Sequence, residues 1–491
     1  MSAPVVQPSF LATRRGKLTL ALLCAIAFLD FVDASIVNIA LPHIRADLHF
    51  SVQNLQWVLS GYLLSYGGFM LLGGRLGDLL GRRRVLVTGT ALFAASSLAG
   101  GCAVNAGMLV GARFAQGLGA ALMLPAALSL LTTSFTEGKD RTTALGVWGG
   151  VAGLASAAGV FLGGVLTEGP GWRWVLFVNP PIAVFLLVAV SWLIPAERRR
   201  APLANFDISG ALLVTGGMLL LVFALVKAPD QGWGSARTIG ELAGAGVLLA
   251  AFLINEQRTR NPLIPLTTFR IRGLGAADVT MLVGAAGIIS MFYFLTLYMQ
   301  NVLGYSPIQT GAAYLPFTAG VAVTAGISSQ LVARTGTRPV LVVGALIAAG
   351  GLYALSRIPA DGSYLADLLP GMMIASVGLG GLFVAVTTAA NARVPAAKAG
   401  LAAALMNASQ QVGGALGLAI FSAIATATTS RLFAEHASPA HALTAGFHRA
   451  LLAEAAFLLA TAFIALRTAN TRGEDHSGAD AEPQVEMASP S

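Results

Sequence analysis

A few ionisable side chains stand inside long apolar stretches of this sequence, where a charge is costly. Asp30 and Asp33 lie in the first stretch, Arg113 in a later one and Glu454 in the last. An ionised side chain at the centre of a lipid bilayer costs at least about 2.5–3.5 kcal/mol, so a residue placed there needs a reason. Two neighbouring carboxylates beside one arginine can take up and release protons as a coupled group. The sequence therefore indicates a proton-responsive group, with an ion pair that only joins two helices as the alternative.

The positions of these residues along their stretches suggest different roles. Asp30 and Asp33 are three residues apart, so both lie toward one face of a helix. Asp33 is nearer the depth of Arg113, and we expect the arginine to hold its charge, whereas the deeper Asp30 is expected to be the better proton carrier. Glu454 lies about 10 Å inside the last stretch, and both a peripheral role and a second protonation site remain open. Asp278, near the start of another stretch, is interpreted as a favourable charge on a helix dipole.

The composition defines the elements that carry these residues. Of 491 residues, 56% are hydrophobic and only 11% are charged, with a mean hydropathy of +0.74. A soluble domain carries roughly 25% charged residues, so a soluble globular protein is excluded. The formal net charge of +8 comes from short basic clusters between apolar runs, which is typical of membrane topology and not of a nucleic-acid-binding surface. The cysteines, Cys24 and Cys102, stand inside apolar runs and indicate neither a disulfide framework nor a metal site.

Apolar runs of about 17–25 residues, each long enough to cross a bilayer, predict about fourteen transmembrane helices. Lys and Arg gather in alternate connections, which by the positive-inside rule places both termini in the cytoplasm. We therefore expect an all-α, multi-pass protein of the cell membrane. The helices are expected near 18–42, 55–76, 85–104, 107–132, 142–167, 174–194, 207–227, 238–255, 274–301, 307–332, 338–356, 364–390, 399–426 and 446–467.

An internal repeat divides the chain. Residues 76–87 and 331–342 share the pattern Leu-x4-Gly-x-Arg-x-Val-Leu-Val, so six helices echo six others and two are left between them. Two facing six-helix bundles with a site near the bilayer midplane are a transporter design, and we expect the two central helices to be peripheral. The predicted parts are a cytoplasmic segment (1–17), the N-terminal bundle (18–195), a two-helix insertion with basic loops (196–272), the C-terminal bundle (273–467) and a disordered acidic cytoplasmic tail (468–491).

Four motifs at matching spacing carry a resemblance to a known family. They are Asp-x-Ser-Ile-Val-Asn-Ile-Ala-Leu-Pro at 33–42, Gly-Arg-Leu-Gly-Asp-Leu-Leu-Gly-Arg-Arg-Arg at 74–84, Arg-x2-Gln-Gly at 113–117, and Trp-Arg-Trp with Asn-Pro within 172–180. In these residues the chain resembles the fourteen-helix drug/proton antiporter family of the major facilitator superfamily. The resemblance implies the major facilitator fold and a proton-coupled secondary transporter that exports amphipathic drugs or antibiotics by alternating access. It also implies a protein that is not an enzyme and whose energy comes from a proton gradient, with no cofactor.

The fifth predicted helix departs from the family pattern. Antiporters of the family carry Gly-Pro followed by Gly-Gly, whereas this chain has Gly159, then Val160, then Gly163 and Gly164. The missing proline removes an expected helix kink, so a major-facilitator importer of a small metabolite, acting as a symporter, stays open as an alternative. Together with Gly153, these glycines are candidate helix-packing positions.

The connection after the second predicted helix is a candidate cytoplasmic gate. Gly74 and Gly81 permit a tight turn, and Asp78 can either pair with Arg82 or cap a neighbouring helix. A rocking motion could exchange these two contacts. Arg82 and Arg83 are open to a simpler interpretation, as part of the basic cluster that sets topology.

Substrate contacts and the energy source are less closely defined. The chain has no Gly-x4-Gly-Lys-[Ser/Thr] loop for ATP and no Gly-x-Ser-x-Gly or His-Glu-x2-His motif, so a membrane enzyme is disfavoured and an ion gradient must drive transport. The expected partners are an amphipathic small molecule, protons and the lipid bilayer, with no nucleic acid and a monomeric state; sodium as the coupling ion and the substrate's identity stay open. Candidate cavity aromatics, which helix packing or an interfacial belt would equally explain, are Trp57, Tyr62, Tyr66, Phe292, Tyr293 and Tyr298.

Overall fold

The computed structural model describes residues 10–135, 139–195, 207–259, 262–263, 273–391, 394 and 399–471, and in these ranges the regular structure is helical. The first part contains η1 (Phe10–Ala12), α1 (Arg14–Leu48), α2 (Val52–Leu55), α3 (Trp57–Leu80), α4 (Arg82–Gly101), α5 (Ala106–Ser134), α6 (Lys139–Glu168), α7 (Trp174–Phe177) and α8 (Asn179–Leu193). The remainder contains α9 (Ile208–Gln231), α10 (Ala236–Arg258), α11 (Leu274–Asn301), α12 (Pro307–Ala313), α13 (Leu315–Thr335), α14 (Thr337–Leu355), η4 (Tyr364–Leu368), α15 (Leu369–Asn391), α16 (Ala399–Ala434) and α17 (Pro439–Ala465).

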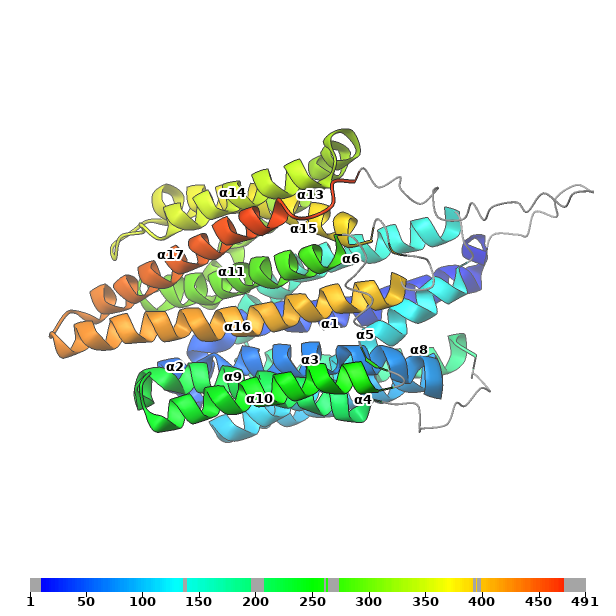
Figure 1. Ribbon diagram of the computed structural model, residues 1–491, viewed down its shortest axis with the longest axis horizontal. Helices are drawn as coiled ribbons and strands as arrows, with labels where there is room; N and C mark the ends of the chain where they lie inside the picture. The colour runs from blue at the N-terminus through cyan, green and yellow to red at the C-terminus, as the bar shows by residue number, and fades with distance from the viewer. Residues whose placement is uncertain are drawn as a thin grey trace, which may run out of the picture.

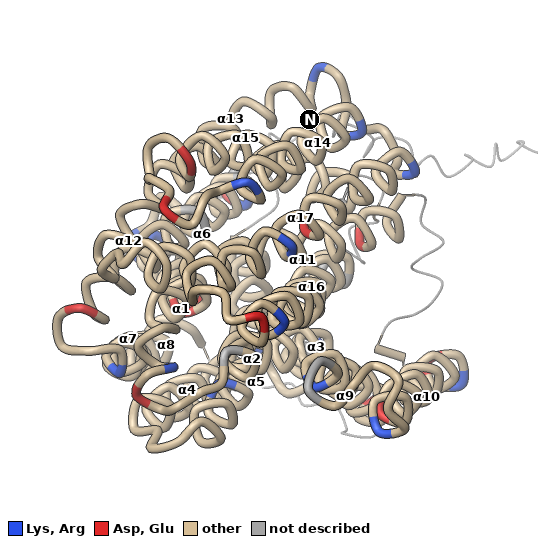
Figure 2. The backbone as a smooth tube through the Cα atoms, turned by 90° about the vertical axis from the view of Figure 1, so that its left-hand side faces the viewer, with Lys and Arg blue, Asp and Glu red and all other residues tan. Residues whose placement is uncertain are grey.

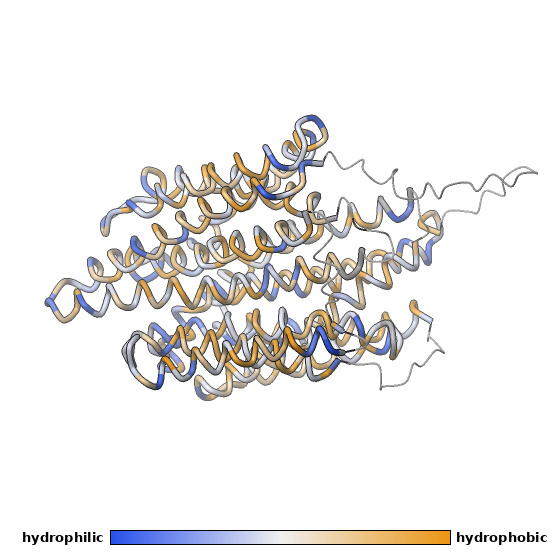
Figure 3. Tube along the Cα trace, in the orientation of Figure 1, coloured by the Kyte–Doolittle hydropathy of each residue, from blue (hydrophilic) through white to orange (hydrophobic). Residues whose placement is uncertain are grey.

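The helices have the length and apolarity that a membrane requires. Among the described residues, 13 helical segments are long and apolar enough to cross a bilayer, and the 20-residue α4 completes the series. Apolar residues dominate the middle of the molecule and polar ones gather at its two ends (Figure 3). The predicted all-helical membrane architecture is confirmed. The helix ends differ from prediction where polar residues extend a helix: α17 begins at Pro439 and not near 446.

The helices run along the long axis of the molecule, so it has two ends (Figure 1). We call the end where α1 begins and α17 ends the terminal end, and the opposite one the distal end. In the first bundle α1 packs against α5, α6 and α8, and α5 packs against α3 and α4; in the second, α11 packs against α16 and α17, and α14 against α15 and α17. The bundles meet through α3 with α16, α6 with α12, and α1 with α11.

The two central helices form a hairpin beside the bundles. α9 and α10 pack against each other, and α9 contacts α3 and α16, which leaves α10 at the edge (Figure 2). Asp207 caps α9: it accepts hydrogen bonds from the Gly210 amide and from Asn255 of α10, each at 2.8 Å. Burial opposes ionisation of Asp207, but the hydrogen bonds from Asn255 and Gly210 outweigh it and lower the pKa of this carboxyl. The hairpin is thus held together by an ionised cap near the end where α9 begins.

At the distal end the two bundles are in close backbone contact. A Cβ added at Gly164 of α6 would lie 2.6 Å from the Pro307 carbonyl oxygen of α12. Nearby, the Ile308 amide donates a hydrogen bond of 3.1 Å to Glu168, the last residue of α6. Because only a glycine permits this approach, Gly164 is a requirement for closing this end of the molecule.

The start of the C-terminal tail is pinned to the second copy of the repeated motif. The Thr337 amide donates to the Thr471 carbonyl at 2.9 Å, and the Arg338 guanidinium donates twice to the Thr468 carbonyl, at 2.7 and 3.0 Å. Thr468 and Thr471 are buried. The disorder predicted from residue 468 onward is therefore wrong for its first four residues, because their backbone groups find partners at the start of α14; residues 472–491 lie outside the described part.

Replacing Arg338 with alanine tests this attachment. Arg338→Ala removes both charge-assisted hydrogen bonds to Thr468 and should destabilise the purified protein by about 1 kcal/mol, seen as a lowered melting temperature in detergent. The matched control is Arg334→Ala, because Arg334 is also exposed and lies one turn earlier, in α13. Equal melting temperatures for the two variants would contradict the attachment.

Candidate functional site

A buried polar network fills the centre of the first bundle. Five helices of this bundle contribute side chains to the network, and each of these side chains is at most 1% exposed. The members are Asp30 and Asp33 from α1, Tyr62 and Tyr66 from α3, Ser97 from α4, Arg113 and Gln116 from α5, and Asn179 from α8.

The Asp33–Arg113 ion pair is the centre of the network. Arg113 Nη1 lies 2.7 Å from Asp33 Oδ2 and 2.7 Å from Gln116 Oε1, and Gln116 Nε2 donates to Asp33 Oδ1 at 2.8 Å, which closes a ring. Arg113 Nε donates to the Val58 carbonyl of α3 at 3.1 Å. The structure thus brings Asp33 and Arg113 together, as their depths predict.

Asn179 of α8 brings a third helix into contact with the Asp33 carboxylate. Its Nδ2 donates to Asp33 Oδ1 at 2.6 Å and to Ser97 Oγ at 2.9 Å, while Ser97 Oγ donates to the Leu176 carbonyl. Asn179 is the first residue of α8 and is followed by proline, so its position is set by the helix start. In the sequence Asn179 is distinguished only by the Asn-Pro motif, as a polar residue at the start of an apolar helix.

Asp30 has different partners. Tyr62 and Tyr66 each donate a hydroxyl hydrogen bond to it, at 2.9 Å to Oδ1 and 2.8 Å to Oδ2. The two tyrosines are four residues apart and therefore share one face of α3. Among the described residues Asp30 has no ion pair, so a proton that binds here displaces no cation. The structure places Tyr62 and Tyr66, candidate cavity aromatics by sequence, in this hydrogen-bonded network.

Tyr62 connects the two carboxylates. The Arg113 guanidinium carbon lies 4.2 Å from the centre of the Tyr62 ring, and the hydroxyl of the same ring is bonded to Asp30. A cation over an aromatic face is stabilised by the ring's charge distribution. A single side chain therefore contacts both Arg113 and Asp30.

The other two acids of the apolar stretches lie in the second bundle. Glu454 in α17 and Asp278 in α11 are 0% and 5% exposed, and neither has a hydrogen-bond partner for its carboxylate among the described residues. Asp278 does not fit the interpretation as a charge on the helix dipole. It lies beyond the first turn of α11, and its carboxylate is buried. The structure does not bring either acid to the Asp30 network.

The candidate gate is a single-residue connection. Gly81 ends α3 and begins α4 with φ of +97°, a conformation that favours glycine. Arg83 Nη2 donates to the Ser191 carbonyl of α8 at 3.1 Å. The remaining gate residues with described surroundings lie in α3 and at the start of α4: Gly74 and Arg82.

For two predicted site residues the structure describes the helix that carries them but not the contacts they make. They are Asp78 in α3 and Gly153 in α6. The exchange of partners by Asp78 and the packing role of Gly153 stay predictions.

The glycines of the fifth-helix motif let α6 approach two other helices. A Cβ added at Gly159 would lie 2.8 Å from the Val32 carbonyl oxygen of α1. A Cβ added at Gly163 would lie 2.5 Å from the Ile36 carbonyl oxygen of the same helix. Gly164 faces α12 across the distal contact. The motif therefore joins α6 both to the helix that carries Asp30 and to the opposite bundle.

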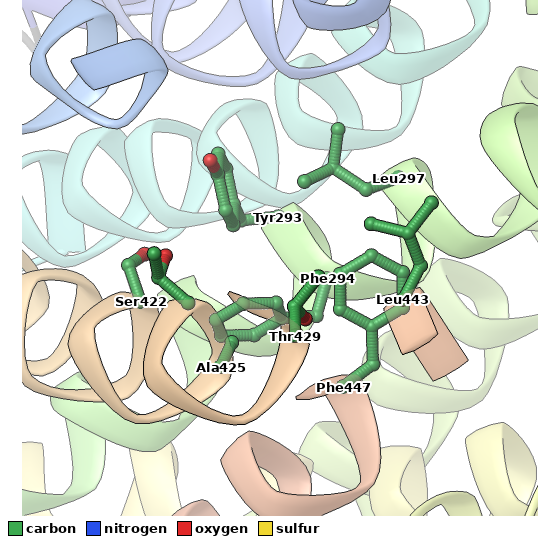
Figure 4. A pocket seen from close by; sticks show the side chains of 9 residues that line it. Tyr293, Phe294, Leu297, Ser422, Ala425, Thr429, Leu443 and Phe447 are labelled. Atoms are coloured by element: carbon green, nitrogen blue, oxygen red, sulfur yellow. The ribbon is translucent and has the colours of Figure 1, made fainter. Parts of the chain in front are cut away.

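The other candidate aromatics do not form one surface. Tyr293 lines a small cavity between α11, α16 and α17 (Figure 4). The remaining three make packing or hydrogen-bond contacts: Trp57 with Phe223, Phe292 with Tyr314 and Phe317, and Tyr298 with the Pro359 carbonyl.

Comparison with known proteins places this geometry among transporters. The model of the Major Facilitator Superfamily matches residues 23–418. The chain is 39% identical over 468 residues to the puromycin resistance protein pur8 of Streptomyces alboniger, with 94% of this chain and 93% of that protein covered. It is 37% identical to the cephamycin export protein CmcT of Amycolatopsis lactamdurans (92% of each chain) and 38% identical to the tetracenomycin C resistance and export protein of Streptomyces glaucescens (87% and 77%).

Solved structures share the fold. A bacterial homologue of the human lysosomal transporter Spinster, in an inward-facing and unoccupied conformation, superposes with a TM-score of 0.64 at 18% identity, covering 93% of this chain and 97% of that one. A D-xylose-proton symporter gives a TM-score of 0.64 at 13% identity, covering 94% and 99%. The match confirms the fold predicted from the four motifs.

Asp33→Asn tests how much the buried ion pair contributes to the stability of the folded protein. The variant leaves the Arg113 guanidinium without a counter-charge in an apolar interior, which should cost about 3–5 kcal/mol and lower the melting temperature strongly. The control is Asp47→Asn, because Asp47 also pairs with an arginine, Arg173, but with side chains 47% and 37% exposed. That variant should lose at most about 1 kcal/mol. Similar losses in both would show that burial of the Asp33–Arg113 pair has little effect.

Proposed function

Because this chain belongs to the Major Facilitator Superfamily, we propose that it exports amphipathic small molecules, such as antibiotics, in exchange for protons. It is a multi-pass protein of the cell membrane. Relatives over most of its length are named for puromycin, cephamycin and tetracenomycin C, which makes these compounds the first substrates to test. A proton gradient supplies the energy without a cofactor, and the working unit is a monomer.

The observation that carries proton exchange is the contrast between Asp30 and Asp33. Asp33 is paired with the Arg113 guanidinium and also accepts hydrogen bonds from Gln116 and Asn179, so a cation already occupies its carboxyl. Among the described residues, the hydrogen-bond partners of Asp30 are the Tyr62 and Tyr66 hydroxyls. Asp30 is therefore the proton carrier of the proposed cycle, and a cationic substrate can compete with the proton for it.

Alternating access follows from the contacts between the bundles. In this structure the distal end is closed where α6 meets α12. Rocking of one bundle against the other would open this end and bring the terminal ends of the bundles together. The gate residues Asp78, Gly81, Arg82 and Arg83 lie at the terminal end, where they would make and break contacts in the same motion.

Import of a small metabolite is the second candidate function, supported by Val160. Where exporters of the family carry proline, α6 continues as a helix from Lys139 to Glu168. The named relatives favour export.

Transport in membrane vesicles separates the two directions. In everted vesicles, puromycin added to an exporter should dissipate an imposed pH gradient. Substrate-driven uptake by right-side-out cells, with no effect in everted vesicles, would favour import instead. A sodium requirement at fixed pH would overturn proton coupling.

Asp30→Asn should separate cationic from neutral substrates. The variant cannot bind either a proton or a cation at this position, so ethidium efflux should fall at least tenfold while some chloramphenicol efflux remains. Asp33→Asn is the comparison and should impair both compounds, because it disrupts the Arg113 site. Efflux from cells that express equal amounts of each variant is the measurement; equal losses of both compounds in Asp30→Asn would show that the roles are assigned wrongly.

Gly164→Val should block closure of the distal end. The added side chain would overlap the Pro307 carbonyl, so transport should fall at least tenfold while expression stays normal. Gly146→Val is the matched control on the same helix, because a Cβ at Gly146 meets nothing within 4 Å. Wild-type transport by Gly164→Val would show that the contact between α6 and α12 is not part of the cycle.

A further inference from the structure

Glu454 lies at the centre of the second bundle and is not used by the mechanism above. It is 0% exposed, and neither carboxylate oxygen has a hydrogen-bond partner among the described residues. α17 runs from Pro439 to Ala465, so Glu454 lies roughly 22 Å from one end of the helix and roughly 16 Å from the other. This depth distinguishes it from Asp278, which lies near the start of α11.

Within the described part of the chain, the helices around Glu454 bring no counter-charge to it. α17 packs against α11, α14 and α16, and the Glu454 backbone lies against Gly287 of α11. Asp278 is nine residues before Gly287, roughly 14 Å along the helix. Arg449 of α17 is exposed and points to another face. The other titratable or charged side chains on these four helices are Tyr293 and Tyr298 (α11), Arg338 and Tyr353 (α14), Arg431 (α16), and His441 and His448 (α17), and no ion pair joins any of them to Glu454.

An ionised carboxylate in such surroundings would be expensive. Moving an unpaired charge into an apolar interior costs several kcal/mol even after relaxation, whereas the neutral acid costs far less. Glu454 is therefore accommodated here as the protonated acid. It can lose the proton only when water or a cation reaches it.

A small cavity lies between α11, α16 and α17 on the distal side of Glu454. Tyr293, Ser422 and Phe447 line it, and it has room for about one water molecule (Figure 4). The Ser422 hydroxyl is buried without a hydrogen-bond partner, so a water in this cavity would have a polar contact. Phe447 is seven residues before Glu454, two helical turns along the same face of α17, so the cavity lies on the distal side of the carboxyl.

We propose that Glu454 is a second proton-binding residue of the exporter, which receives its proton from the distal side through this cavity. The inference rests on the proposed proton exchange and adds to it. On binding, a proton from distal water forms an O–H bond with the Glu454 carboxylate, and in the other conformation that proton passes to water on the terminal side. With Asp30 in the first bundle and Glu454 in the second, each substrate molecule exported is exchanged for two protons.

The number of protons moved per substrate is the direct test. In proteoliposomes with purified protein, the wild type should take up two protons per molecule of chloramphenicol, and Glu454→Gln, which is permanently neutral, should take up one. Glu454→Asp keeps an acid and should keep two. Glu435→Gln, at an exposed position just beyond α16, is the control and should also keep two. A ratio of one in the wild type, or an unchanged ratio in Glu454→Gln, overturns the proposal, whereas a wild type that moves no protons overturns the proposed function itself.

Chemical labelling decides the matter if Glu454→Gln does not fold. Dicyclohexylcarbodiimide reacts with protonated carboxyls in apolar surroundings, so the peptide with Glu454 should be labelled in the wild-type protein at neutral pH and found by mass spectrometry. Glu435 should stay unlabelled, because it is exposed to water and lies beside Arg431. Puromycin bound under the same conditions should leave the labelling of Glu454 unchanged if the proton alone uses this site. Absence of label at Glu454 would overturn the proposal.

Discussion

The buried ion pair between Asp33 and Arg113 is the constraint on which the first bundle depends. A guanidinium placed in an apolar interior requires a counter-charge and acceptors for its fixed fork of donors. Asp33 supplies the counter-charge to Nη1, which Gln116 also accepts from, and the Val58 carbonyl accepts from Nε; Nη2 has no hydrogen-bond partner among the described residues. Asn179 donates to the same carboxylate from a fourth helix. The positions of α1, α3, α5 and α8 are thereby fixed by one charge pair, in a medium where apolar burial provides no preference for one helix contact over another.

The ion pair has a second carboxylate beside it, with different partners. Asp30 lies one helical turn from Asp33, yet its partners are the neutral hydroxyls of Tyr62 and Tyr66. Since Tyr62 also lies under the Arg113 guanidinium, the two carboxylates are connected although only one is paired. Asp33 and Asp30 thus share one helix but differ in their partners: Asp33 lies in an ion pair, and Asp30 accepts hydrogen bonds from two tyrosine hydroxyls.

The features that could be predicted are those that depend only on the order and spacing of residues along the chain. Helix number, the internal repeat and the meeting of Asp33 with Arg113 follow from apolar length, spacing and depth. The contact of Tyr62 and Tyr66 with Asp30 requires knowledge of how α3 is rotated about its axis, and a helix that is apolar on all sides carries no such signal. Asn179 was missed for a similar reason, because a polar residue at a helix start can cap its own helix or reach across to another.

The two kinds of contact in this molecule also determine which parts can move. The network around Arg113 cannot open, because separating its charges would leave an unpaired ion in an apolar interior. The distal contact includes backbone packing at Gly164 and Gly311 and a hydrogen bond from the Ile308 amide to the exposed Glu168 carboxylate, so water can replace part of it when the bundles separate. A transition between conformations will therefore break contacts between the bundles and keep those within the first bundle. In the proposed exchange, a proton bound to Asp30 would move with this unit, and the way the bundles meet would control its access to either side.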